Sequence, residues 1–174
     1  VRRRSIGFVF QQFNLFPALT ALENVEYALN VKGLKGGEAE REARRVLDAV
    51  GLGDRKSFLP RDLSGGQKQR LFIALALIND PEVVFLDELT TGLDPQARRT
   101  IWDLVRDIRE RGKTVFLTTH LMEEAERLCD RVAIIENGQI IDVDTPQGLI
   151  GRHCPQRTVI LDTEDAAAQG FFQK

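Results

Sequence analysis

The sequence VVFLDE at residues 83–88 is the strongest indication of the fold class of this 174-residue chain. Four apolar residues stand directly before two carboxylates, Asp87 and Glu88. A short apolar run without alternation is typical of a parallel strand that is buried on both faces. Ligands of open α/β sheets bind at the carboxyl ends of such strands, where the two acids would lie. Acids also end strands for no functional reason, so the pair becomes a candidate site only if other motifs support it.

The sequence TVFLTTH at residues 114–120 predicts a second buried strand, which ends at His120. At the carboxyl end of a parallel strand, this histidine would lie level with the acid pair and within reach of a phosphate. His153 has no comparable context, and we expect it on the surface.

The order of the remaining elements predicts the topology. A β-rich run at residues 5–10 opens the chain and is followed by Gln11. The spacing of apolar residues predicts helices at residues 20–31, 38–50, 65–79, 95–111 and 122–128. Because several helices separate the first strand from the second, we expect an α/β domain with a helical insertion after its first strand.

The C-terminal part predicts a smaller unit of structure. Strands are expected at residues 131–136 and 139–143, and Asn137-Gly138 between them is a strong hairpin signal. Thr145 is expected to begin a last short helix, and residues 159–161 are again β-rich.

The sequence LSGGQKQR at residues 63–70 contains two candidate functions. Ser64 and Gln67 fit the S-x-x-Q capping box, which begins a helix. That box does not account for Gly65 and Gly66, because glycine costs a helix about 1 kcal/mol relative to alanine. A helix N-terminus with open N–H groups and little side-chain bulk binds anions, so we expect a phosphate to approach here.

The sequence TTGLDP at residues 90–95 has a simple structural explanation. Asp94 is a favourable N-cap, and Pro95 suits the first position of a helix. Taken alone, this motif predicts only where a helix begins.

Composition excludes several classes of protein. The formal net charge of −2 gives no support to general nucleic-acid binding. Cys129 and Cys154 are too far apart for metal-type spacing, and we expect reduced thiols. The longest apolar run, residues 71–78, is too short to span a bilayer.

Five motifs in this order resemble the nucleotide-binding subunits of ABC transporters, over about residues 6–149. FVFQQ resembles the Q-loop, LSGGQ the signature motif, VVFLDE the Walker B strand, TGLDP the D-loop, and LTTH the switch histidine. Residues 119–140 are most similar to the branch that exports drugs and polysaccharides. The resemblance implies an ATP hydrolase with a P-loop NTPase-like, mostly parallel sheet and an α-helical insertion subdomain.

The resemblance also implies roles for individual residues. Glu88 would be the catalytic carboxylate and His120 the γ-phosphate switch, while Asp87 and Gln11 would bind Mg²⁺. ATP would be contacted by Gln11, Ser64, Gly65, Gly66, Gln67 and Asp94. The signature residues would face ATP on a second ATP-binding subunit in a head-to-tail dimer. The implied partners are that subunit and a transmembrane permease, with no nucleic acid, at the cytoplasmic face of the cell membrane.

The sequence departs from the family pattern in several places. It contains no GxxxxGK[ST] P-loop, since the nearest stretch, residues 51–57, follows a helix and lacks the second glycine. We therefore expect a truncated chain that lacks the first strands and is inactive alone. Residues 1–150 would form a partial ABC ATPase domain, with a helical subdomain at about 18–80, and residues 151–174 would begin a C-terminal extension. Leu89 replaces the usual proline, and Leu75 replaces a usual arginine.

Two alternatives remain open at this point. The chain would be a degenerate, non-enzymatic subunit if it donates only its signature face to an intact partner. It would be an ABC-type ATPase acting on DNA or ribosomes if it followed other branches of the family. The short insertion between Gln11 and Leu63 shows no heptads, and the chain is not basic, so the sequence disfavours the second alternative.

Overall fold

The computed structural model describes residues 6–9 and 15–154. Gln11 and the β-rich residues 159–161 lie outside the described residues. The contacts within the chain divide it into two compact units, Val1–Cys129 and Asp130–Lys174. The division of the chain at residue 150 stays a prediction.

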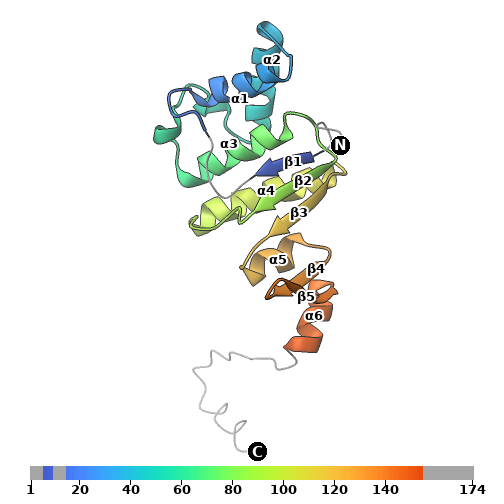
Figure 1. The fold of residues 1–174 in the computed structure, drawn as a ribbon. Helices are drawn as coiled ribbons and strands as arrows, with labels where there is room; N and C mark the ends of the chain where they lie inside the picture. Colours follow the sequence, from blue (N-terminus) through green and yellow to red (C-terminus); the bar gives the residue numbers. More distant parts are fainter. Residues whose placement is uncertain (1–5, 10–14, 155–174) are drawn as a thin grey trace, which may run out of the picture. The chain divides into compact units, whose positions relative to one another are not determined.

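The first unit is built on a parallel sheet with the strand order β1-β2-β3. These strands are β1 (Ile6–Val9), β2 (Val83–Asp87) and β3 (Thr114–Thr118). In the register of the sheet, Asp87 lies opposite Thr118. Because all three strands are parallel, their carboxyl ends meet at one edge, as the sequence predicted (Figure 1).

Five helices of the first unit follow the predicted order. Their bounds are α1 (Ala21–Val31), α2 (Gly37–Ala49), α3 (Gly65–Leu77), α4 (Pro95–Glu110) and α5 (Met122–Leu128). Short 3-10 turns at Gly53–Arg55 and Pro60–Asp62 join α2 to α3. The helical insertion therefore stands where it was expected, between β1 and β2.

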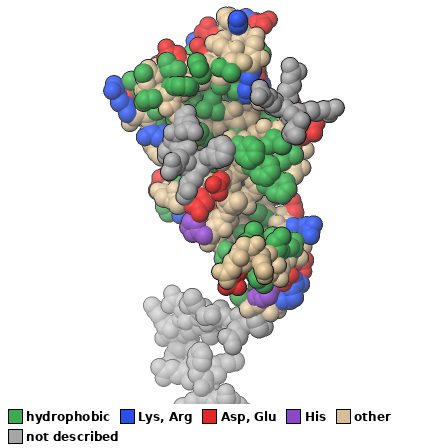
Figure 2. All heavy atoms as spheres, in the orientation of Figure 1, with side chains coloured by type: hydrophobic (Ala, Val, Ile, Leu, Met, Phe, Trp, Pro, Cys, Tyr) green, Lys and Arg blue, Asp and Glu red, His purple; other side chains and the backbone are tan. Residues whose placement is uncertain are grey.

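The two faces of the sheet differ in burial. Val84 and Leu86 of β2 are fully buried in the same core as residues of α3 and α4, such as Ile73 and Ile101. On the other face, the rings of Phe8, Phe85 and Phe116 stack across the three strands, with centroids 4.7 Å and 5.0 Å apart. Phe8 and Phe116 are each more than half exposed, and Figure 2 shows hydrophobic side chains over this face.

The helical insertion begins at a well-formed cap. Thr20 is the N-cap of α1, and its side chain and that of Glu23 form a capping box. The buried Asn24 holds the preceding loop, since its amide donates to three backbone carbonyls, those of Phe16, Leu19 and Thr20. Capping and buried apolar side chains such as Leu29 therefore fix the start and the packing of α1.

The second unit contains β4 (Val132–Glu136), β5 (Gln139–Asp144) and α6 (Pro146–His153). The two strands are antiparallel, and the predicted hairpin is confirmed. Asn137 and Gly138 have φ values of 50° and 76°, the left-handed region that a tight two-residue hairpin turn requires. Within the described part of the chain, no helix is both long and apolar enough to cross a membrane.

Candidate functional site

Three of the predicted site residues gather at the carboxyl ends of β2 and β3. Asp87 ends β2, and Glu88 follows it. His120 stands two residues after β3. The Nδ1 atom of His120 lies 3.6 Å from Oε1 of Glu88, with side chains 58% and 33% exposed. Figure 2 shows acidic side chains beside a histidine at this edge of the sheet, so the three groups can meet a ligand from solvent.

The backbone of Glu88 adopts an uncommon conformation. Its φ of 45° lies in the left-handed region, which costs a residue with a side chain about 1–2 kcal/mol. The N–H of Glu88 donates to the carbonyl of Thr118 (3.1 Å), and the carbonyl of Glu88 accepts from the N–H of Thr91 (3.3 Å). These two bonds hold the chain as it leaves the sheet, and such strain is concentrated at functional sites.

Thr118 was missed as a site residue by sequence reasoning, although LTTH was recognised as a motif. Its hydroxyl donates to Oδ1 of Asp87, and it also approaches the N–H of Glu88 (3.3 Å). Thr118 thereby fixes the carboxylate that ends one strand from the end of the next. The signal in the sequence was a hydroxyl residue at the strand end opposite Asp87, but only the register identifies that pairing.

The predicted capping box at the start of α3 is confirmed. The N–H of Ser64 donates to Oε1 of Gln67 (2.8 Å), and the N–H of Gln67 donates to Oγ of Ser64 (3.3 Å). The first helical residues, Gly65 and Gly66, have N–H groups with no acceptor inside the helix. This end of α3 therefore presents donors and a positive dipole, as an anion site needs.

The glycines at this helix start have a packing explanation as well. A Cβ atom on Gly66 would lie 2.8 Å from the Cβ of Ala97 in α4, which is closer than real Cβ atoms come. A Cβ on Gly65 would lie 3.2 Å from Cδ2 of Leu93. The close approach of α3 to the start of α4 therefore requires a glycine at residue 66, whether or not a phosphate binds there.

Asp94 lies in the same region as the signature residues. It is the N-cap of α4, where its Oδ1 accepts from the N–H groups of Gln96 (3.0 Å) and Ala97 (2.9 Å). A small hollow between the first turns of α3 and α4 is lined by Ser64, Gly66, Gln67, Arg70, Ala97 and Thr100. The signature motif at the start of α3 therefore lies beside the start of α4, which Asp94 caps.

Two further positions near the candidate site are held by contacts with other parts of the first unit. Arg70 lines the hollow between α3 and α4, and its guanidinium donates to the carbonyls of Val50 (3.3 Å) and Gly51 (2.8 Å) at the end of α2. Burial lowers the pKa of its guanidinium, which is the expected effect of desolvating a cation. Leu89, which stands where the family usually has proline, is 2% exposed and packs into the core.

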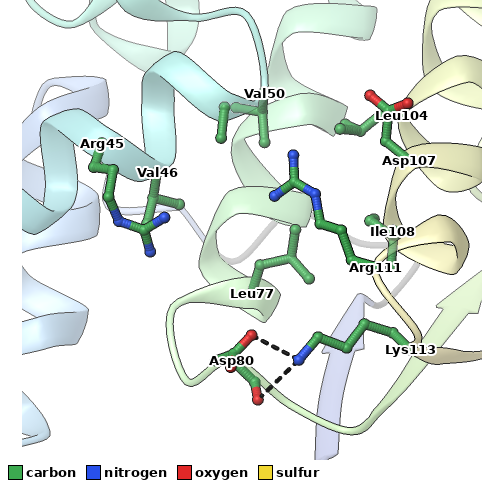
Figure 3. A pocket seen from close by; sticks show the side chains of 11 residues that line it. Arg45, Val46, Val50, Leu77, Asp80, Leu104, Asp107, Ile108, Arg111 and Lys113 are labelled. Carbon is green, nitrogen blue, oxygen red and sulfur yellow. Dashed lines mark hydrogen bonds and ion pairs between the residues drawn. The ribbon is translucent and has the colours of Figure 1, made fainter.

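A second cavity of the molecule contains none of the predicted site residues. It lies among α2, α4 and the end of α3, where Lys113 pairs with Asp80 at 2.6 Å (Figure 3). Figure 3 shows the guanidinium of Arg111 pointing toward Val50 in a wall of apolar side chains. This cavity lies where several helices meet. The candidate catalytic residues lie elsewhere, at the carboxyl ends of β2 and β3.

The strand-end residues fit a phosphate ligand with its magnesium ion. Mg²⁺ takes oxygen ligands, usually one or two carboxylates together with phosphate oxygens and water. Asp87 offers an exposed carboxylate already oriented by Thr118. Among residues 6–9 and 15–154, no cluster of three or more metal-ligating side chains is found.

Comparison with known proteins identifies the family. A family model described as ABC transporter matches residues 1–91 of the 174. The chain belongs to the ABC transporter family. A solved dimeric structure of an ATP-binding cassette, in a post-hydrolysis state with ADP and Pi, is 39% identical with a TM-score of 0.72. The matched region covers 83% of this ABC transporter chain and 64% of the chain in the solved structure. The match confirms the predicted ABC ATPase fold.

Curated relatives of this ABC transporter chain are named as import proteins. The methionine import ATP-binding protein MetN of Streptomyces avermitilis is 46% identical over 150 residues, which cover 86% of the chain and 43% of that protein. The MetN protein of Escherichia coli K12 is 45% identical over 144 residues, which cover 82% and 42%. The chain therefore spans less than half the length of these relatives. The predicted family is confirmed, and the predicted exporter branch gains no support.

Proposed function

We propose that this chain is part of an ATP-binding subunit that hydrolyses ATP to drive the import of a small molecule. The observation that carries the proposal is the approach of His120 to Glu88 beside Asp87, at the exposed carboxyl ends of two parallel strands. Fold alone does not imply function. Here the residues that would perform the chemistry stand together on the fold that the family uses for it.

In the proposed reaction, the oxygen of a water molecule would attack the γ-phosphorus of ATP, and Glu88 would accept a proton from that water. The bond to ADP breaks, and inorganic phosphate leaves with the added oxygen. His120 would donate an N–H to the oxygens of the transferred phosphoryl group and thereby stabilise the negative charge that develops there. Asp87, oriented by Thr118, would hold Mg²⁺ together with Gln11, and this ion would neutralise charge on the phosphates.

The signature surface would act on a second subunit. The open N–H groups at the start of α3 suit a phosphate, and they lie at a hollow between the first turns of α3 and α4, where Asp94 caps α4 and accepts from the N–H of Ala97. We propose that Ser64, Gly65, Gly66 and Gln67 contact the γ-phosphate of ATP held by a partner subunit in a head-to-tail dimer. A transmembrane permease would be the other partner, which would hold the subunit at the cytoplasmic face of the membrane.

The direction of transport is proposed from the relatives. Their printed names assign them to methionine import. We therefore replace export with import, and methionine is the first substrate to test. The substrate itself would be selected by the permease, since the described residues offer only the nucleotide-side chemistry.

Phosphate release by the full-length protein tests the proposal. With Mg²⁺ and ATP, the rate per subunit should rise with protein concentration as dimers form. In proteoliposomes that carry the permease, hydrolysis should accompany accumulation of methionine on the same side of the membrane as the ATP-binding subunit. Absence of phosphate release at every concentration would favour the degenerate subunit, and hydrolysis coupled to efflux would restore the exporter prediction.

A further inference from the structure

Glu124 of α5 is a buried acid that the sequence motifs did not single out. It is 1% exposed, whereas its neighbours Glu123 and Glu126 lie on the surface. Charged side chains are rarely buried this completely unless specific partners hold them. The position of Glu124 therefore calls for a reason that packing alone does not supply.

One carboxylate oxygen of Glu124 accepts hydrogen bonds from two other segments of the chain. Its Oε1 accepts from the hydroxyl of Thr90 at 2.9 Å and from Nε1 of Trp102 at 2.9 Å. Its Oε2 is also buried and has no hydrogen-bond partner among the described residues. The burial cost of the carboxylate is thus offset on one side only, so the two bonds to Oε1 hold it in place.

These bonds connect the two segments that carry the proposed catalytic groups. Thr90 is 0% exposed and follows Glu88 by two residues, within the loop that leads from β2 to Asp94. Glu124 follows His120 by four residues, in the helix that the histidine loop enters. Trp102 anchors the same carboxylate to α4. Any shift of one loop relative to the other would stretch the hydrogen bond between Thr90 and Glu124.

We propose that Glu124 is a positioning residue. It would keep the loop after β2, which carries Glu88, at a fixed position relative to the loop after β3, which carries His120. The inference rests on the proposed function, because the relative position of the two loops matters for activity only if Glu88 and His120 act on one substrate. Glu88 itself has a strained backbone, with φ of 45°, and strain of this kind persists only where surrounding contacts over-determine the conformation. The buried bond to Thr90 is such a contact.

The decisive variants remove or keep the hydrogen bonds. Glu124→Leu removes the acceptor, and Thr90→Val removes one donor while it leaves Glu124 in place. Glu124→Gln keeps an oxygen that accepts both bonds, and Thr90→Ser keeps the hydroxyl. Glu126→Leu, on the exposed face of the same helix, is the matched control. All are made in the full-length protein, and kcat and KM for ATP are measured per folded subunit, well below each melting temperature.

Glu124→Leu and Thr90→Val should each lower kcat by about tenfold or more, because small misplacements of reacting groups cost that much. KM for ATP should stay within about twofold, and Glu124→Gln, Thr90→Ser and Glu126→Leu should keep kcat near the wild-type value. If Glu124→Leu does not fold, Thr90→Val carries the test. Wild-type kcat in Thr90→Val would overturn the inference, and so would equal losses in Glu124→Gln and Glu124→Leu. A wild-type protein without ATPase activity would instead refute the proposed function.

Discussion

Two clusters of predicted site residues differ in what holds them. At the strand ends, Glu88 and His120 are partly exposed, and Glu88 keeps a left-handed backbone. At the helix starts, Ser64 and Gln67 cap α3, and Gly66 lets α4 come close. The first cluster is not explained by packing, whereas capping and packing account for most of the second.

This difference decides how far a motif can be used as an argument for function. A capping box together with close-packed glycines would be retained in a helix pair that never meets a phosphate. A strained acid beside an exposed histidine has no comparable structural benefit. The strand-end cluster is therefore the stronger support for ATP hydrolysis, and the signature surface needs an experiment that separates its two explanations.

The largest expected effect comes from the strand-end cluster. Glu88→Gln removes the proposed proton acceptor but keeps the size of the side chain. General base catalysis contributes about 10²–10⁴-fold, so kcat for ATP hydrolysis should fall by a factor in this range. ATP binding should persist, because the carboxylate is not needed to hold the nucleotide. Phosphate release and equilibrium nucleotide binding in the full-length protein measure the two effects.

Glu82→Gln is the matched control for this substitution. Glu82 is exposed and precedes β2, so it lies at the opposite end of the same strand. It should leave kcat unchanged. If Glu88→Gln also kept wild-type kcat, the strand-end cluster would be no more functional than the capping residues, and the contrast between the clusters would disappear.

A smaller effect is expected from Gly66→Ala, which tests the packing explanation. The new Cβ would lie 2.8 Å from the Cβ of Ala97, so the two helices must move apart. Overpacking of this kind costs about 1–3 kcal/mol of unfolding free energy. Gly65→Ala should cost less, because its nearest neighbour is the end of the flexible Leu93 side chain, at 3.2 Å. Chemical denaturation measures both.

The double variant Gly66→Ala with Ala97→Gly separates packing from phosphate binding. It removes the close Cβ pair, so most of the stability lost in Gly66→Ala should return, after subtraction of the cost of Ala97→Gly alone. If a phosphate also approaches Gly66, hydrolysis should stay low in this restored protein. Full recovery of hydrolysis together with stability would leave the signature glycine with a packing role only.

Much of the fold could be predicted, because the sequence marks it locally. Short apolar runs, helical spacing and the caps at Ser64 and Asp94 indicate the elements and where two of the helices begin. The contact between Glu88 and His120 followed from two parallel strands that end at one edge. These features depend on neighbours in sequence or on a general rule of parallel sheets.

Contacts between distant segments could not be predicted in the same way. The bond from Thr118 to Asp87 depends on strand register, and the burial of Glu124 depends on the positions of Thr90 and Trp102. The guanidinium of Arg70 donates to two carbonyls at the end of α2, which are about twenty residues earlier in the chain. A single sequence contains the residue types for these contacts but not the pairing.

The smallest expected effect is on the titration of Asp144, next to the start of α6, a helix start that can be compared with that of α3. Thr145 caps α6 as Ser64 caps α3, but Asp144 stands next to it and accepts from its N–H at 2.7 Å. Hydrogen bonds from Arg152, and then from the N–H of Thr145, lower the pKa of Asp144. A carboxylate of the chain itself therefore lies next to the N-cap of α6 and accepts from its N–H, as the side chain of Gln67 does at α3.

This contribution to stability has a defined pH dependence. Because the folded pKa of Asp144 is lowered, the stabilisation is complete above the ordinary aspartate pKa of about 3.9 and is lost as the pH falls through the folded pKa. Carboxyl NMR should give Asp144 a titration midpoint below that ordinary value, and Arg152→Gln should raise the midpoint. An unshifted midpoint would mean that the pairing does not persist in solution. The N–H of Thr145 would then lack the acceptor that the N–H of Ser64 has in Gln67 at the start of α3.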